Sequence, residues 1–296
     1  MTHRKAVWMM LAAALLWSIA GVVSRHLEAA RSFEVTFWRS AFNALALLVL
    51  LSWLRGPAEL RRTLRTGGRA LWLSGLCWAV MYTAFMVALT LTSVANVLVT
   101  MSIGPLLTAI LSRLLLKHHL PRTTWAAIAL AGAGIAWMYG HEVSTGDSQH
   151  LLGTVVALAV PVAAAVNWTL LQHLRGRDDP PDMLGAVLLG ALLSAAITLP
   201  LALPLLASPR DISLLALLGV VQLAIPCLMA VAAARVLSAP EISLLGLLEV
   251  LFGVLWAWLG AGEAPSGAVL GGGALVLAAL SAHAALALRG AGRTGR

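Results

Sequence analysis

Two stretches of the sequence, one in each half, decide the fold: SVANVLVTMSIGPLLTAILSRLLLKHH (residues 93–119) and SAPEISLLGLLEVLFGVLWAWLGAGEA (residues 238–264). They align at an offset of 145 residues, with few identities but one shared pattern. In each stretch, a short turn precedes a long apolar helix, which ends in a charged or histidine-containing break. The pattern predicts that the second half of the chain repeats the first.

Apolar segments continue outward from these stretches to both ends of the chain. A helix needs about 20 apolar residues to cross a bilayer. Apolar runs bounded by charge, glycine or proline predict ten transmembrane helices, at residues 6–24, 34–54, 70–91, 94–116, 122–140, 151–174, 182–206, 212–236, 240–260 and 267–288.

These spans predict an all-α integral membrane protein with ten transmembrane helices in two inverted five-helix repeats. The first repeat is expected at residues 1–140, a connecting loop at 141–150 and the second repeat at 151–296. Because five spans per repeat is an odd number, the second repeat must be inverted across the membrane. Inverted repeats are common among secondary transporters, whose substrate sites lie near the midplane between the repeats.

Composition excludes a sizeable soluble domain. Of 296 residues, 60% are hydrophobic and 11% are charged, and the mean hydropathy is +0.90, whereas about a quarter of the residues of a soluble domain are charged. The net charge of +8 does not indicate nucleic-acid binding, because the basic residues lie between apolar runs instead of on one face. We therefore interpret them as topology determinants.

Basic residues are distributed unequally between the two sides of the membrane. If the N-terminus is cytoplasmic, sixteen of the 20 Lys and Arg residues lie inside, and only Arg25, Arg31 and Arg210 lie outside, with Arg39 within a helix. Cytoplasmic segments carry such an excess of basic residues. The distribution predicts a multi-pass protein of a bacterial-type inner (plasma) membrane with both termini in the cytoplasm.

At this level of detail the chain resembles the EamA-like ten-helix exporters of the drug/metabolite transporter superfamily. The most specific segment is ARVLSAPEISLLGLLEVLFGVLWAWLGAGE (residues 234–263), and ALTLTSVANVLVTMSIGPLLTAILSRLLLKHH (residues 88–119) is similar in turn. The resemblance covers nearly the whole chain. It implies export of small metabolites or drugs, with amino acids, aromatic ones included, among the substrate classes.

The chain departs from the family pattern at two places. Val250 follows Glu249 where the family usually has Glu-Pro, and His118 occupies the position that corresponds to Glu263 in the second half. Both departures weaken a mechanism that rests on symmetric carboxylates, and neither affects the expected fold.

Two charged side chains within apolar spans are candidates for the substrate cavity. An ionised Glu249 nine residues into its span must pair, face water or take up a proton, so proton-coupled export and a structural hydrogen bond are alternative roles for it. Arg39 lies five residues into its span with Asn43 one turn on. Arg39 either binds a substrate carboxylate or extends to the membrane surface.

Further candidates are polar or aromatic side chains in the middle of spans. Asn96 and Thr100 begin a stripe of polar and small residues that recurs every four positions, which indicates either a cavity-facing side or close helix packing. Aromatic side chains in mid-span, with neighbouring polar ones, are expected to line a cavity for a flat solute or to pack in the core. This set comprises Trp17, Ser18, Trp78, Tyr82, Asn167 and Trp168.

Prolines interrupt two of the predicted helices. Gly104-Pro105 and Pro226 are candidate hinges for alternating access, because proline removes a backbone hydrogen bond. Static kinks explain the same residues equally well.

The sequence therefore predicts a secondary transporter that exports small metabolites around a central cavity. An uncoupled facilitator or channel and, less favoured, a membrane-embedded enzyme are the alternatives. We expect a small-molecule substrate, membrane lipid as surroundings and protons as the candidate coupling ion. No nucleic acid, cofactor, metal or enzymatic activity is expected, since no ATP-binding loop or catalytic cluster is found. A monomer is compatible with the sequence, which does not determine the oligomeric state.

Overall fold

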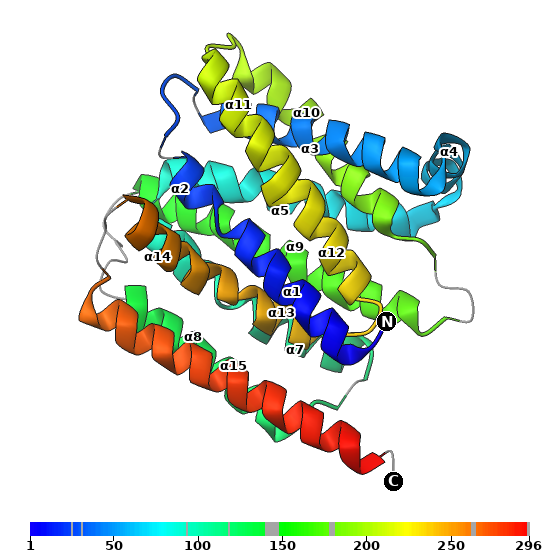
Figure 1. Ribbon diagram of the computed structural model, residues 1–296, viewed down its shortest axis with the longest axis vertical. Helices are drawn as coiled ribbons and strands as arrows, with labels where there is room; N and C mark the ends of the chain where they lie inside the picture. Colours follow the sequence, from blue (N-terminus) through cyan, green and yellow to red (C-terminus); the bar gives the residue numbers. More distant parts are fainter. Residues whose placement is uncertain are drawn as a thin grey trace.

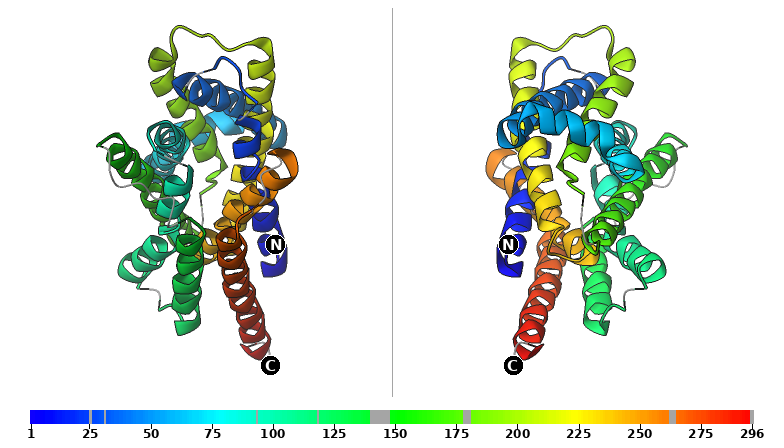
Figure 2. Two further views of the ribbon diagram at one scale, coloured as in Figure 1. Left: turned by 90° about the vertical axis from the view of Figure 1, so that its left-hand side faces the viewer. Right: turned by 90° about the vertical axis from the view of Figure 1, so that its right-hand side faces the viewer.

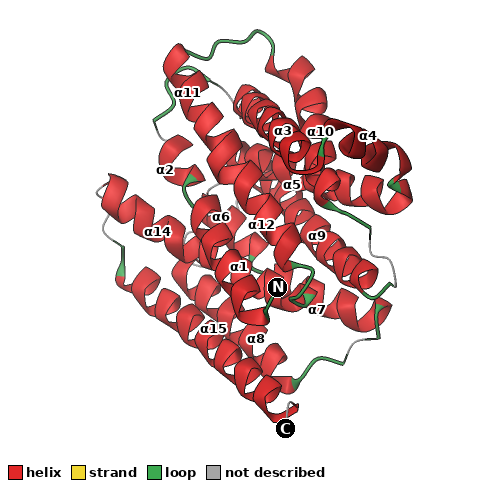
Figure 3. Ribbon diagram, turned by 45° about the vertical axis from the view of Figure 1, so that its right-hand side comes forward, coloured by secondary structure: helices red, strands yellow, loops and turns green. Residues whose placement is uncertain are grey.

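The described part of the chain is entirely helical. The computed structural model describes residues 1–24, 26–30, 32–92, 94–117, 119–139, 148–177, 181–261 and 265–294. Every regular element in these residues is a helix, which confirms the predicted all-α class (Figure 3). Eight helical segments are long and apolar enough to cross a membrane, and Gly267–His283 is a shorter apolar helix.

The first half contains helices at each of its five predicted spans. Two of these spans are broken in the middle and contain two helices each. In chain order the helices are α1 (His3–Trp17), α2 (Ala20–Ser24), α3 (Ser32–Arg55), α4 (Pro57–Thr66), α5 (Gly68–Leu91), α6 (Val94–Met101), α7 (Gly104–Leu115) and α8 (Arg122–Tyr139).

Helix α4 lies in the connection between the second and third predicted spans, where no element was predicted. Gly56 precedes it with φ at +83°, and Pro57 lies in its first turn, where the missing N–H group costs no hydrogen bond. Leu60 is buried and Leu64 packs against the core, while the arginines of α4 are exposed. Its amphipathic pattern therefore places α4 at the end of the bundle.

The second half repeats this arrangement. Its helices are α9 (Ser148–Arg175), α10 (Leu184–Ala202), α11 (Pro209–Leu217), the π-helix η2 (Leu218–Ala224), α12 (Ile225–Ala233), α13 (Ala239–Gly246), α14 (Leu248–Ala261) and α15 (Gly267–Thr294). Pro161 lies inside α9 without ending it, and Pro226 lies in the first turn of α12 directly after η2.

The fourth and ninth spans break at equivalent places. The first break is at Ser102 and Ile103, between α6 and α7, and the second is at Leu247, between α13 and α14. These positions differ by the same 145 residues as the sequence repeat. Pro105 contributes to the first break, because its ring nitrogen has no hydrogen to donate. The second break forms without a proline, since Val250 occupies the corresponding position.

The two halves pack against each other along several of their long helices. The most extensive contacts each join a helix of the first half to one of the second: α8 with α15, α3 with α10, α5 with both α9 and α10, and, less extensively, α1 with α12. Helices α8 and α15 run side by side along one edge of the bundle (Figures 1 and 2). Helix α1 begins and α15 ends at the same end of the bundle (Figure 1).

Candidate functional site

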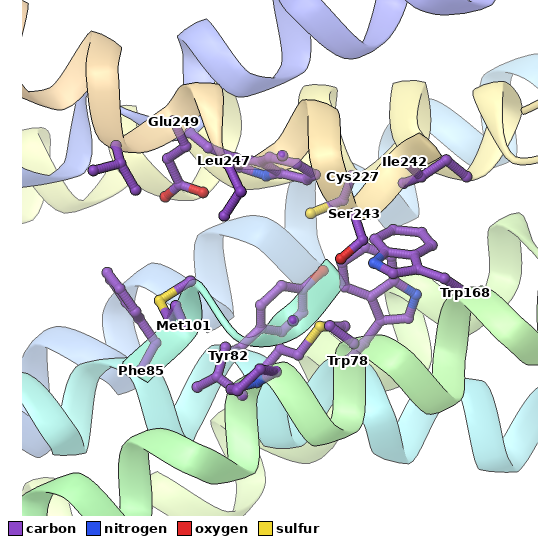
Figure 4. Close-up of a pocket in the computed structure, with 18 of the residues that line it drawn as sticks. Trp78, Tyr82, Phe85, Met101, Trp168, Cys227, Ile242, Ser243, Leu247 and Glu249 are labelled. Atoms are coloured by element: carbon purple, nitrogen blue, oxygen red, sulfur yellow. The ribbon is translucent and has the colours of Figure 1, made fainter. Parts of the chain in front are cut away.

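A cavity of about 160 Å³ lies between the two halves, at the level of the two helix breaks. Both halves contribute to it, and Figure 4 shows α13 and α14 on one side and α5 and α9 on the other. Large apolar side chains make up much of its lining, among them Met10, Trp17, Trp78, Met81, Phe85, Leu98, Met101, Val160, Trp168, Leu223, Ile242 and Leu247. An apolar protein cavity of about 150 Å³ is large enough for a benzene ring. The cavity can therefore hold the ring of a small solute.

The helix breaks bring backbone and charge to this cavity. Gly104 and Pro105 line it from the first break, and Gly246, Leu247 and Glu249 line it from the second. Backbone groups at such breaks lack their usual helical partners, and buried breaks are tolerated where they line a cavity. Glu249 is in the first turn of α14, near the helix end that favours negative charge.

Arg39 and Glu249 place opposite charges on the walls of the cavity. Arg39 is 1% exposed and donates from Nη2 to the backbone oxygen of Tyr82 at 2.9 Å. The carboxyl group of Glu249 points into the cavity in Figure 4. A cavity with one cation and one anion fits a solute that carries both charges.

Several buried donors at the cavity have no hydrogen-bond partner among the described residues. They are Nε of Arg39, Nε1 of Trp78 and the hydroxyl of Tyr82. The Tyr82 hydroxyl lies near Asn43 and the Cys227 thiol but has no hydrogen-bond geometry to either. Buried polar groups nearly always have partners. Three residues that line the cavity thus carry a buried donor without a partner in the described structure.

An aromatic cluster forms one end of the cavity. The rings of Trp78 and Tyr82 are stacked with centroids 5.6 Å apart, and Trp78 meets Trp168 edge-on at 5.6 Å. Such mutual contacts hold the rings in fixed orientations. Fixed rings form a rigid wall for a flat, apolar group.

Sequence reasoning missed two polar residues of the cavity wall, Gln222 and Ser243. Gln222 lies in the π-helix η2, is 3% exposed and donates to the backbone oxygen of Trp17 at 3.2 Å, where α1 ends. The oxygen of its side chain has no partner in the described structure. A lone amide in an apolar span was the available signal, and π-helical turns often mark functional sites.

The predicted cavity residues fall into two groups in the structure. One group lines the cavity and comprises Trp17, Arg39, Trp78, Tyr82, Trp168 and Glu249, with the hinge candidates Gly104 and Pro105. The other group does not line it and comprises Ser18, Asn43, Asn96, Thr100, Asn167 and the hinge candidate Pro226.

Most residues of the second group are engaged in bonds between or within helices. Ser18 accepts a hydrogen bond from Trp256 Nε1 at 3.0 Å, and Asn167 accepts one from Ser74 at 2.6 Å. Asn96 donates to Thr92 and Thr154, and Thr100 donates to the backbone oxygen of Asn96. Ser18, Asn96 and Asn167 thus join helices, as polar residues often do in membranes, whereas the bond of Thr100 stays within α6.

The structure does not describe the two positions of the symmetric carboxylate pattern, and its described part shows no metal-binding cluster. His118 and Glu263, the departures from the symmetric carboxylate pattern, lie outside the described residues. Across the described ranges, no group of three His, Cys, Asp or Glu side chains is arranged to hold a metal ion.

Comparison with known proteins identifies the fold and the family. A solved structure titled "Crystal structure of protein" shares 18% identity, covers 96% of this chain and 99% of that chain, and superposes with a TM-score of 0.77. No curated protein matches the chain. The model of the EamA-like transporter family matches twice, at residues 4–140 and 151–282, which confirms the resemblance. Since the two matches span most of the chain, it belongs to the EamA-like transporter family.

Proposed function

We propose that this protein is a secondary transporter that exports amino acids with a large apolar or aromatic side chain. The observation that carries the proposal is the composition of the central cavity: one cation, one anion and an aromatic wall around a space of about 160 Å³. Arg39 binds the carboxylate, Glu249 binds the ammonium group, and Trp78 and Trp168 contact the side chain. An amino acid presents these three features together.

The unpaired donors support this assignment of roles. Nε of Arg39 and the Tyr82 hydroxyl have no partner in the described structure, so a carboxylate would satisfy both. Guanidinium groups bind carboxylates through two parallel hydrogen bonds. Because most of the other lining side chains are apolar, the cost of removing the solute's charges from water must be offset by these contacts.

Transport proceeds by alternating access around this cavity. Gly104 and Pro105 at one helix break and Gly246 at the other supply the positions where the fourth and ninth spans can bend. The solute enters from the end of the bundle where α1 begins, which the excess of arginine assigns to the cytoplasm. The proposal includes a location in a bacterial-type inner membrane with both termini inside.

Reconstitution into proteoliposomes tests the proposal. A panel of amino acids, nucleosides and cationic dyes is offered, with and without an imposed pH gradient. We expect saturable transport of tryptophan and phenylalanine and little transport of nucleosides or dyes. A pH-gradient response that disappears in Glu249→Gln would assign proton coupling to Glu249, whereas transport that ignores the gradient would identify a facilitator. Transport of none of the amino acids would refute the proposal.

A further inference from the structure

A second cavity of about 340 Å³ lies at the arginine-rich end of the bundle. It is formed by the ends of α3, α9 and α12 and by the residues that precede α10, at the end of Figure 1 where the N-terminus lies. Its lining residues are Arg55, Leu171, Leu174, Arg175, Pro181, Asp182, Met183, Val231, Ala234 and Arg235.

The second cavity lies in line with the central one along two helices. Trp168 of α9 lines the central cavity, and Leu171 and Leu174 of the same helix line the second. On α12, Cys227 lines the central cavity and Val231 lines the second. Residues three or four apart face the same side of a helix, about one turn along. The two cavities therefore lie about one helix turn apart along α9 and α12.

A buried apolar layer separates the two spaces. Leu171, Leu174 and Val231 are 6%, 2% and 3% exposed, and all belong to the apolar cluster that includes Trp168. A solute moving between the cavities must displace this layer.

Among the residues that the structure describes, three cations and one anion line the second cavity. Asp182 lies 3.3 Å from Arg55 and 3.1 Å from Arg235. Arg175 donates to the backbone oxygens of Val236 and Leu237 at 2.6 and 3.0 Å. The described part of the lining thus has a positive excess, and Arg175 is held in place by the backbone that follows α12.

The ion pairs of Asp182 with Arg55 and Arg235 are partly exposed to solvent. The side chains of Arg55 and Arg235 are 43% and 57% exposed, and that of Asp182 is 27% exposed. Ion pairs in contact with water contribute little to stability. An incoming carboxylate can therefore replace Asp182 as the partner of either arginine at little cost.

We propose that this second cavity is an anion-accepting vestibule, which binds the carboxylate of the transported solute before it passes to the central cavity. This inference rests on the proposed transport function. Arg55 and Arg235 receive the carboxylate by exchange with Asp182, and Arg175 adds to the positive potential. The layer of Leu171, Leu174 and Val231 is the gate between the second cavity and the central cavity.

Chemical labelling tests the vestibule without any transport assay. A cysteine is introduced by Pro181→Cys, at a half-buried position of the cavity wall, in a Cys77→Ala/Cys227→Ala background that lacks both natural cysteines. The labelling rates with an anionic and a cationic methanethiosulfonate are compared in detergent. We expect Arg55→Gln/Arg235→Gln to lower the anionic-to-cationic ratio by roughly threefold to tenfold, because the positive potential attracts the anionic reagent.

The control is Arg62→Gln, which removes an arginine of the same end that is exposed and paired with Glu59 at 2.8 Å. It should leave the ratio unchanged. A ratio that the double substitution does not change, or that Arg62→Gln changes equally, would overturn the proposal. Protection of the cysteine by short-chain phosphatidylglycerol but not by tryptophan would also overturn it and assign the cavity to a lipid headgroup.

Transport kinetics separate a failure of this inference from a failure of the proposed function. In proteoliposomes that transport tryptophan, Arg55→Gln/Arg235→Gln should raise the KM measured from the arginine-rich side severalfold and leave the KM from the other side unchanged. An equal KM change on both sides would refute the vestibule alone. Absence of tryptophan transport by the unmodified protein, with the labelling ratio as expected, would refute the transport proposal and leave an anion site.

Discussion

Helix α10 packs so closely against α5 at Gly190 that no β-carbon fits between them. A Cβ at Gly190 would overlap the Cβ of Trp78 and lie 2.9 Å from the backbone oxygen of Gly75 and 3.1 Å from the backbone nitrogen of Ala79. These atoms belong to helix backbone or lie next to it, so they cannot rotate away. Because Trp78 lines the central cavity, this contact also fixes the cavity wall.

We predict that Gly190→Ala destabilises the protein. The helices must separate by about 1 Å to restore van der Waals distances, which weakens the dispersion contacts along the interface. Overpacking of this kind costs about 1 to 3 kcal/mol. Alanine also favours the helix by about 0.5 to 1 kcal/mol relative to glycine, which offsets part of the loss.

Gly132→Ala is the matched control, because a Cβ at Gly132 of α8 meets nothing within 4 Å. It retains the gain in helix propensity without the overlap. The difference in free energy of unfolding between the two variants therefore isolates the overpacking, about 1 to 3 kcal/mol. Reversible unfolding of the purified variants in mixed micelles measures it. Equal stability of Gly190→Ala and Gly132→Ala would refute the close approach of α5 and α10.

Two further predictions concern buried polar contacts. Asp211 accepts hydrogen bonds from the backbone N–H groups of Glu28, Ala29 and Ala30 at 2.8 to 3.0 Å. Asp211→Ala should therefore lower the free energy of unfolding by about 2 to 4 kcal/mol and speed backbone hydrogen exchange at residues 26–30. Unchanged exchange at these residues, measured by mass spectrometry, would contradict the prediction. Gln222→Leu removes the donor to the carbonyl at the end of α1 and should lower the free energy of unfolding in micelles by about 1 kcal/mol, whereas a gain in stability would show that this bond contributes nothing.

Much of the architecture was predictable from sequence because the membrane restricts it. A span must be apolar and about 20 residues long, so the hydropathy pattern locates helices at all ten predicted places. Arg39 and Glu249 were candidates for the same reason, since a charge within an apolar span is costly and needs a specific environment. Both line the cavity in the structure.

Other features depend on tertiary contacts that no local pattern encodes. The break at Leu247 forms without a proline at Val250, and the π-helix η2 has no distinct sequence signature. The stripe that begins at Asn96 and Thr100 could face either a cavity or a neighbouring helix, and periodicity alone does not distinguish the two. In the structure Asn96 bonds to Thr154 of α9.

The central claim is that Arg39 binds the carboxylate and Glu249 the ammonium group of one solute. Calorimetry with tryptophan, tryptamine and indole-3-propionate, on the unmodified protein, Arg39→Gln and Glu249→Gln, tests it most directly. A charge-assisted hydrogen bond contributes about 1.5 to 3 kcal/mol, so each substitution should weaken tryptophan binding by roughly tenfold to a hundredfold. Arg39→Gln should spare tryptamine, and Glu249→Gln should spare indole-3-propionate. Equal losses for all three ligands in both variants, or no loss for tryptophan, would contradict the account.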